Sequence, residues 1–155
     1  MTQVAMMASL KLSMKLNPQV IAFMTPFPHS IDINAPLAQA RKMMREGHFR
    51  HLPVTSGGEI VGVVTDRDIK LLLGPDFANP DERELKVHDA YVDKPCVVPA
   101  STPVEIVART MAEHHIGSAI VTKNDKLVGI FTATDACRAL ADVLHRHPGE
   151  TDSAA

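Results

Sequence analysis

Cysteine is scarce in this sequence, which has only Cys96 and Cys137 among its 155 residues. Two cysteines without CxxC spacing provide no disulfide scaffold, and they suit a reducing compartment. No uncharged apolar run approaches the roughly 18 residues that a membrane helix needs. The N-terminus lacks the early basic residues and the cleavage site of a secretory signal. We therefore expect a cytoplasmic protein with no membrane contact.

An excess of basic residues is also missing, because the net charge is −2 with histidine neutral. A dedicated nucleic-acid binder normally has a strongly basic face, so we expect no nucleic-acid partner. A local patch of Arg41, Lys42, Arg45 and Arg50 is the weaker alternative. The composition, 45% hydrophobic and 22% charged, is that of a globular protein. The length is near that of one domain and permits a real core.

An internal repeat organises the chain. Residues 24–73 align without a gap on residues 91–140, at a constant offset of 67. Apolar positions between the identical pairs also correspond, among them Leu37/Val104, Ala40/Val107 and Val63/Ile130. The identical pairs include Pro36/Pro103, Met44/Met111, Gly62/Gly129, Thr65/Thr132 and Asp68/Asp135. The chain is therefore predicted to contain two copies of one structural unit.

Each repeat predicts the element order β-α-β-β-α. An extended entry, at residues 30–33 and 96–98, precedes a helix with apolar side chains at i, i+3, i+4 and i+7. Two strands then form a hairpin around a turn rich in Gly, Asn or Asp. These strands are expected at 51–55 and 59–64, and at 118–122 and 126–131. A second helix is expected to begin at Asp66 or Ala133.

The first helix of each repeat carries start and stop signals. Asn34, and the Ser-Thr pair at 101–102, are predicted caps followed by a proline in the first helical turn. The threonine of that pair and Glu105 have the spacing of a capping box. Gly47 is predicted to end the first of these helices in a left-handed conformation, and His114 takes the same place in the second.

The predicted domain boundaries follow the repeat. Repeat one spans residues 20–73, a turn-rich linker loop spans 74–86, and repeat two spans 87–147. Residues 1–19 form an N-terminal segment whose apolar pattern fits a strand and a helix equally. Residues 148–155 are predicted to be a flexible tail.

Four segments resemble a known family. Residues 51–54 (HLPV) and 60–68 (IVGVVTDRD) closely resemble a CBS domain, named for cystathionine β-synthase. Residues 116–121 (IGSAIV) and 127–135 (LVGIFTATD) are similar to the same family. The resemblance implies an α+β fold, a pair of CBS repeats related by a pseudo-twofold axis, with sheets packed against helices.

The resemblance extends over about residues 20–144. Residues 24–26 (Met-Thr-Pro) resemble the usual entry to a first repeat, whereas residues 91–93 and Ile120 depart from the family pattern. The family implies two clefts for adenosine-containing regulatory ligands, among them AMP, ADP, ATP, NAD, S-adenosylmethionine and cyclic dinucleotides. It also implies a homodimer, an unknown protein target and no catalytic cofactor.

The resemblance implies that each nucleotide is shared between the repeats. The residues of one cleft would be Val63, Thr65, Arg67 and Asp68 with Lys94, Val97, Ile116, Gly117 and Ser118. The residues of the other would be Ile130, Thr132, Thr134 and Asp135 with Ser30, Ile31, Phe49, Arg50 and His51. Arg50 and His51 would favour a phosphate in the second cleft, although Arg50 fits an ordinary solvated surface charge equally well. Ile31, Val97, Phe49 and Ile116 fit an adenine sandwich and fit plain core equally well.

The motif Gly-x-x-Thr-x-x-Asp has its own chemistry. It places a strand end at a helix N-terminus, where free N–H groups and the helix dipole favour a phosphate. An ionised aspartate accepts hydrogen bonds only, as ribose hydroxyls require. Thr-x-x-Asp is also the spacing of a simple helix cap, and the two roles are compatible. Asp66 and Arg67 also fit ion pairs along the helix surface.

Metal and enzyme classes have little support in the sequence. The histidines at 48 and 51, and at 145 and 147, lack a zinc-ligand pattern. No serine or cysteine stands in a nucleophile motif, and buried structural thiols account for Cys96 and Cys137. The main functional alternative is a ligand-free structural module that dimerises or docks a protein partner. An enzyme that consumes a bound nucleotide is a third possibility.

Overall fold

The computed structural model describes residues 17–27, 29–74 and 83–146. The chain divides into two compact units. The repeat-1 unit comprises Pro28–Pro95, and the repeat-2 unit comprises Met1–Phe27 together with Cys96–Ala155. The described part of each unit is α+β, with one four-stranded sheet and two α-helices. The fold class predicted from the sequence is confirmed.

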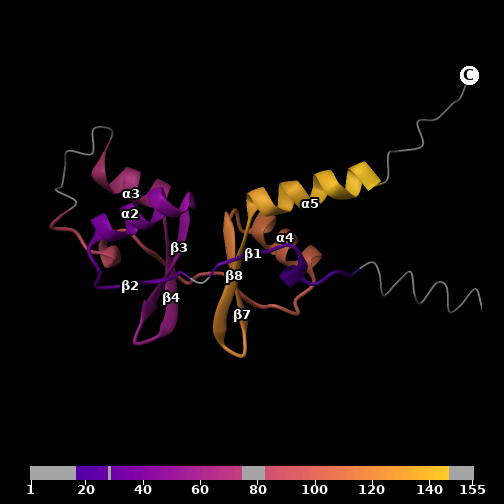
Figure 1. Cartoon of the computed structure of the whole chain (residues 1–155), viewed down its shortest axis with the longest axis horizontal. Coiled ribbons are helices and arrows are strands. Elements are labelled where there is room, and N and C mark those ends of the chain that lie inside the picture. The colour runs from indigo at the N-terminus through magenta and orange to yellow at the C-terminus, as the bar shows by residue number, and fades with distance from the viewer. Residues whose placement is uncertain (1–16, 28, 75–82, 147–155) are drawn as a thin grey trace, which may run out of the picture. The chain divides into compact units, whose positions relative to one another are not determined.

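The repeat-1 unit has the sheet order β2-β3-β4-β5, in which β2 runs parallel to β3 and the other pairs are antiparallel. Helix α2 packs against β3 and α3, and α3 packs against β4 (Figure 1). The elements are β2 (Ile31–Asp32), α2 (Leu37–Gly47), β3 (His51–Ser56), β4 (Glu59–Thr65), α3 (Asp66–Leu73), the 3-10 turn η2 (Val87–Asp89) and β5 (Val92–Asp93).

The repeat-2 unit repeats this plan with the sheet order β1-β8-β7-β6. Helix α4 packs against β7 and α5, and α5 packs against β8. The elements are the 3-10 turn η1 (Val20–Ala22), β1 (Thr25–Pro26), β6 (Val97–Pro99), α4 (Val104–Glu113), β7 (Ser118–Lys123), β8 (Lys126–Thr132) and α5 (Ala133–Arg146).

The two repeats exchange their edge strands. Strand β1 belongs to repeat one in the sequence, yet Pro26 pairs with Gly129 on β8 of the repeat-2 unit. Strand β5 belongs to repeat two in the sequence, yet Asp93 pairs with Gly62 on β4 of the repeat-1 unit. Both strand pairs bring two backbones close together at a glycine. A Cβ atom on Gly62 would lie 2.6 Å from the Val92 carbonyl oxygen, and a Cβ atom on Gly129 would lie 2.8 Å from the Thr25 carbonyl oxygen. Glycine is therefore needed there for close approach of two backbones.

The predicted hairpins are confirmed, with strands that extend one residue beyond each predicted C-terminal end. The turn residues have positive φ, at 59° for Gly57 and 86° for Gly58, and at 51° for Asn124 and 60° for Asp125. Two consecutive residues with positive φ give the turn the twist that a two-residue hairpin loop requires. Helices α3 and α5 begin at the predicted residues, Asp66 and Ala133.

The predicted caps of the first helices are wrong. Pro36 and Pro103 are themselves the N-cap residues of α2 and α4, and no side chain caps either helix. Backbone carbonyls replace the side chains, because Leu37 N–H donates to Leu85 at 2.9 Å. In the same way, Val104 N–H donates to Pro18 at 2.8 Å.

The predicted left-handed positions are wrong by one residue. Gly47 remains helical, and His48 follows it at φ 55°. His114 has φ −97°, and His115 follows it at 54°. His48 and His115 are themselves related by the offset of 67, so the repeat is preserved at this detail. Histidine is among the side chains that tolerate the left-handed region.

Each unit has its own core of buried apolar side chains. In the repeat-2 unit the core cluster comprises Val20, Ala100, Val107, Met111, Ala119, Val121 and Phe131. In the repeat-1 unit the buried hydrophobic residues include Ile31, Leu37, Ala40, Met44, Leu52, Val54, Val64, Ile69, Leu73 and Val87. The predicted helix stripe of Leu37, Ala40 and Met44 is confirmed.

Three predictions concern segments that lie wholly or mostly outside the described residues: the N-terminal segment, the tail, and most of the linker loop. The last linker residues are described, and Lys86 bridges to Pro36.

The two cysteines differ, because Cys96 is partly buried whereas Cys137 is exposed on α5. The prediction of a buried structural thiol is therefore wrong for Cys137, which lies on the solvent side of an amphipathic helix.

Candidate functional site

The Thr-x-x-Asp motif of repeat one joins the end of β4 to the start of α3. Asp68 N–H donates to Thr65 Oγ1 at 3.1 Å, while Asp68 Oδ2 accepts from Thr65 N–H at 3.2 Å and from Thr65 Oγ1 at 2.5 Å. These reciprocal bonds form a capping box. The capping role expected from the spacing is therefore present, and it fixes both side chains at the helix N-terminus.

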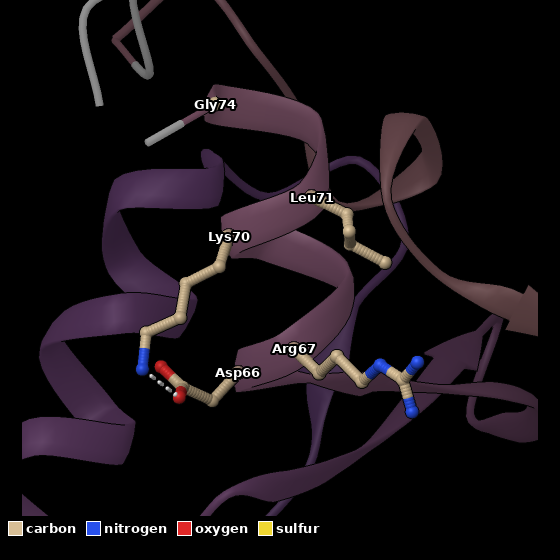
Figure 2. A pocket seen from close by; sticks show the side chains of 5 residues that line it. All are labelled: Asp66, Arg67, Lys70, Leu71 and Gly74. Carbon is tan, nitrogen blue, oxygen red and sulfur yellow. Dashed lines mark ion pairs between the residues drawn. The ribbon is translucent and has the colours of Figure 1, made fainter. Parts of the chain in front are cut away.

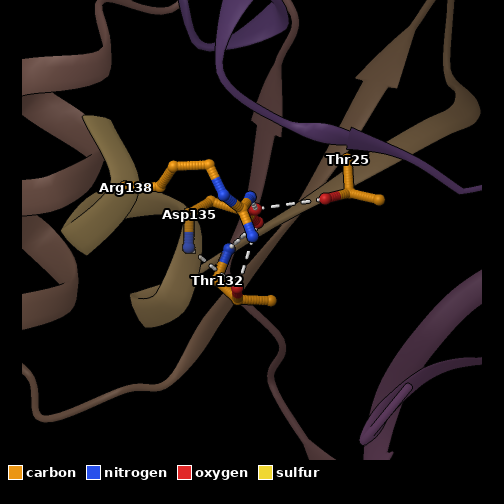
Figure 3. A network of polar contacts seen from close by, with 4 residues as sticks. All are labelled: Thr25, Thr132, Asp135 and Arg138. Carbon is orange, nitrogen blue, oxygen red and sulfur yellow. Dashed lines mark hydrogen bonds and ion pairs between the residues drawn. The ribbon is translucent and has the colours of Figure 1, made fainter. Parts of the chain in front are cut away.

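The motif of repeat two is built in the same way at the junction of β8 and α5. Asp135 Oδ2 accepts from Thr132 N–H at 2.9 Å and from Thr132 Oγ1 at 3.0 Å, and Asp135 N–H donates to Thr132 Oγ1 at 3.3 Å. Two further donors reach the other carboxylate oxygen. They are Thr25 Oγ1 on β1 at 3.1 Å and Arg138 Nη1 on α5 at 3.0 Å (Figure 3).

The sequence interpretation missed Thr25 and Arg138. Thr25 lies 110 residues from Asp135 in the chain and reaches it because β1 pairs with β8. From the sequence, the Met-Thr-Pro segment resembles only the entry to a first repeat. At the offset of 67, Thr25 corresponds to Val92 and Arg138 corresponds to Leu71. Two hydrogen-bond donors thus stand where the other copy has apolar residues, and this difference is the signal that could have identified the pair.

Within the repeat-1 unit, the structure brings together predicted residues that were assigned to different clefts. His51 is the cross-strand partner of Thr65, and the Arg50 carbonyl accepts from Asp66 N–H at 2.9 Å. The side chain of Arg50 is exposed and that of His51 is half-buried. Arg50 and His51 thus lie next to Thr65 and Asp66 at the start of α3.

The same arrangement occurs within the repeat-2 unit. Ser118 pairs with Thr132, and the Gly117 carbonyl accepts from Ala133 N–H at 3.1 Å. Gly117 and Thr134 are exposed, while Ser118 is half-buried. The predicted combination of residues from both repeats in one cleft stays a prediction, since each unit is described by itself.

The predicted adenine contacts differ in how deeply their side chains are buried. Ile31 is 3% exposed, so its side chain belongs to the core. Ile130, which was predicted as a cleft residue without an adenine contact, is 4% exposed and is also part of the core. Val97 is 42% exposed on β6. Phe49 is half-buried and stacks on His29, with ring centroids 5.8 Å apart and an interplanar angle of 15°. One face of the Phe49 ring is therefore already covered.

The remaining predicted residues are Val63, Lys94, Ser30, Ile116 and Arg67. Val63 and Ile116 are half-buried, whereas Ser30 and Lys94 are exposed. Lys94 adopts a positive φ of 57° directly after β5. Arg67 is exposed at the start of α3 and extends its guanidinium away from the helix (Figure 2).

Arg67 also lines an open depression beside α3, with a volume of about 460 Å³ (Figure 2). The other lining residues are Asp66, Lys70, Leu71 and Gly74. Asp66 Oδ2 lies 2.5 Å from Lys70 Nζ, so the predicted surface ion pair is present for Asp66. Exposed i,i+4 pairs contribute only about 0.3–0.5 kcal/mol. The depression thus offers a ligand an apolar wall and the guanidinium of Arg67, which has no ion-pair partner in the part of the chain that the structure describes.

Burial lowers the pKa of His51 below the usual 6.5, Asp68 opposes this change, and Arg50 adds to it. At neutral pH His51 is therefore an uncharged donor and acceptor beside Thr65. Burial raises the pKa of the Cys96 thiol, which keeps that thiol protonated.

Among the residues that the structure describes, no group of three or more His, Cys, Asp or Glu side chains is arranged to hold a metal ion. In the same part of the chain, no helix has the length and apolar character needed to cross a bilayer.

A family model for the CBS domain matches residues 20–74 and 87–142. The chain is 36% identical to the uncharacterised protein YlbB of Bacillus subtilis over 99 aligned residues, and these residues make up 63% of this chain. The aligned region spans 65% of YlbB and 39% of another curated relative, so it covers less than two thirds of either.

Solved structures share the fold. A structure of a putative acetoin utilization protein (AcuB) from Vibrio cholerae matches with a TM-score of 0.70 and 24% identity, over 87% of this chain and 99% of that one. A structure of CBSX2 in complex with AMP matches with a TM-score of 0.67 and 27% identity, over 81% of this chain and 97% of that one.

Proposed function

Because the chain belongs to the CBS domain family and carries two of its repeats, we propose that it is a regulatory module for an adenosine-containing ligand. The observation that carries this proposal is the strand–Thr-x-x-Asp–helix junction, built twice with the same reciprocal bonds. The relative CBSX2, which was solved in complex with AMP, supports the ligand class.

The junction of repeat one supplies the chemistry that a nucleotide needs. Asp66 N–H and Asp68 N–H already donate to Arg50 and Thr65, so the Arg67 N–H and the dipole of α3 are the groups that favour a phosphate at this end of the helix. Arg67, exposed at the start of α3, adds a guanidinium group, which can form paired hydrogen bonds to phosphate oxygens. Asp68 is an acceptor for ribose hydroxyls. These groups bind the ligand through hydrogen bonds alone, and we propose that the module senses its ligand and does not consume it.

A thermal-shift series tests this function. AMP, ADP, ATP, NAD and S-adenosylmethionine are compared, with GMP as the matched control. A ligand that binds only the native state stabilises it by about 2.7 kcal/mol at 100 times its Kd. For a chain of this size the melting temperature then rises by about 5–10 °C. A saturable rise with one adenosine compound and none with GMP is the expected result. No rise with any of the five would favour the ligand-free docking module.

We also propose that the module self-associates through α5. Leu140, Val143 and Leu144 are 58%, 52% and 61% exposed and recur at i, i+3 and i+4, so they form one apolar stripe. Sedimentation velocity is expected to give a dimer for the wild type and a monomer for Leu144→Glu. Arg146→Glu, a charge change at the exposed end of the same helix, is the control. A Leu144→Glu variant that sediments as a dimer would exclude this face.

A further inference from the structure

The carboxylate of Asp135 has no acceptor position left. An ionised carboxylate offers about four lone-pair positions, two on each oxygen. Oδ2 receives Thr132 N–H and Thr132 Oγ1, and Oδ1 receives Thr25 Oγ1 and Arg138 Nη1. The residue is only 5% exposed. All four positions are thus filled by the protein itself, as Figure 3 shows.

The carboxylate of Asp68 is only half used. Its Oδ2 atom receives Thr65 N–H and Thr65 Oγ1, as in the other copy. Among the residues that the structure describes, none donates a hydrogen bond to its Oδ1 atom. The side chain is half-buried, and within the described ranges this oxygen keeps two open positions.

The difference has a direct cause in the sequence. Val92 pairs with Val63 where Thr25 pairs with Ile130, so Val92 stands in the place of Thr25. Leu71 stands in the place of Arg138, at the same offset of 67. Neither valine nor leucine has a side-chain donor. Both are exposed, at 48% and 71%, so their identity is not dictated by the core.

A ribose presents two adjacent hydroxyls and needs two acceptor positions on one carboxylate. Asp68 has these positions, whereas Asp135 would first have to release Thr25 and Arg138. We infer that Thr25 and Arg138 close the second motif, so that the chain binds one ribose diol, at Asp68, while Asp135 fastens β1 to α5. This inference rests on the proposed function and assigns different roles to its two motifs.

The repeat itself supplies the matched variants. Thr25→Val with Arg138→Leu gives the second motif the residues of the first. Val92→Thr with Leu71→Arg gives the first motif the residues of the second. Isothermal titration calorimetry with AMP is expected to show one site in the wild type and two after the first exchange. The second exchange, at exposed positions, is expected to weaken the wild-type site by at least tenfold.

A second ligand tests the diol directly. The wild type is expected to bind 2′-deoxy-AMP at least tenfold more weakly than AMP, because one of the two hydroxyls is lost. Two equal sites in the wild type, or equal affinity for both ligands, would overturn the inference and leave the proposed function intact. Absence of AMP binding in the wild type would defeat the proposed function and the role of Asp68 together.

The fastening role of Asp135 has a readout that needs no ligand. Amide hydrogen exchange in residues 20–27 is expected to be faster in the Thr25→Val and Arg138→Leu variant than in the wild type, because β1 loses its side-chain link to α5. The Val92→Thr and Leu71→Arg variant is the control and should leave this segment unchanged. Unchanged exchange in both variants would contradict the fastening role.

Discussion

Replacement of Phe131 by alanine is expected to remove a large part of the stability of the chain. Phe131 is fully buried at the centre of the repeat-2 core, against Val20, Val107 and Met111. A Phe→Ala change in such a site costs about 3–5 kcal/mol, since it removes buried apolar surface and leaves a cavity. Domains of this kind have a total stability of about 5–15 kcal/mol. The expected fall in melting temperature is about 6–20 °C.

Urea unfolding followed by circular dichroism measures this loss. Ile21→Ala is the matched control, because Ile21 is apolar, lies in the same unit and is 41% exposed. Its effect should lie within about 0.5 kcal/mol of zero. Equal losses in the two variants would show that Phe131 is not a centre of this core.

Replacement of Gly129 by valine is expected to separate β1 from β8. A Cβ atom at this position would lie 2.8 Å from the Thr25 carbonyl oxygen and would also meet the Met24 sulfur atom. The sulfur is on a flexible side chain, but the carbonyl belongs to the paired backbone and must shift. Overpacking of this kind costs about 1–3 kcal/mol. Loss of the β1 pairing adds to that cost.

Two measurements together identify the cause. Urea unfolding gives the loss of stability, and hydrogen exchange shows whether residues 20–27 open selectively. Lys126→Val, at the exposed start of the same strand, introduces the same side chain without the backbone contact. A Gly129→Val variant as stable as Lys126→Val, with protected β1 amides, would show that the close approach does not constrain this position.

Much of this fold could be predicted because the signals are local. The hairpins follow from apolar strands around Gly-Gly and Asn-Asp turns, whose conformations few other residues tolerate. The stripe of Leu37, Ala40 and Met44 follows from helical periodicity. The starts of α3 and α5 follow from Thr-x-x-Asp, whose side chains bond the backbone three residues away.

The predictions were wrong or incomplete where backbone groups, or residues distant in the chain, make the contacts that neighbouring side chains were expected to make. Carbonyl groups of Pro18 and Leu85 satisfy the first N–H groups of α4 and α2, so the predicted side-chain caps were not needed. The exchange of β1 and β5 depends on pairing across the chain, which periodicity does not report. The link from Thr25 to Asp135 was missed for the same reason, although it decides how the two motifs differ.

The central claim is that an adenosine ligand binds at the junction of β4 and α3. Titration of the 15N-labelled protein with AMP, followed by amide chemical shifts, tests it most directly, with GMP as the control. We expect saturable shifts for the amides of Thr65, Asp66, Arg67 and Asp68 with AMP and none with GMP. Saturable shifts that spare these four amides, or no saturable shift anywhere in the spectrum, would contradict the claim.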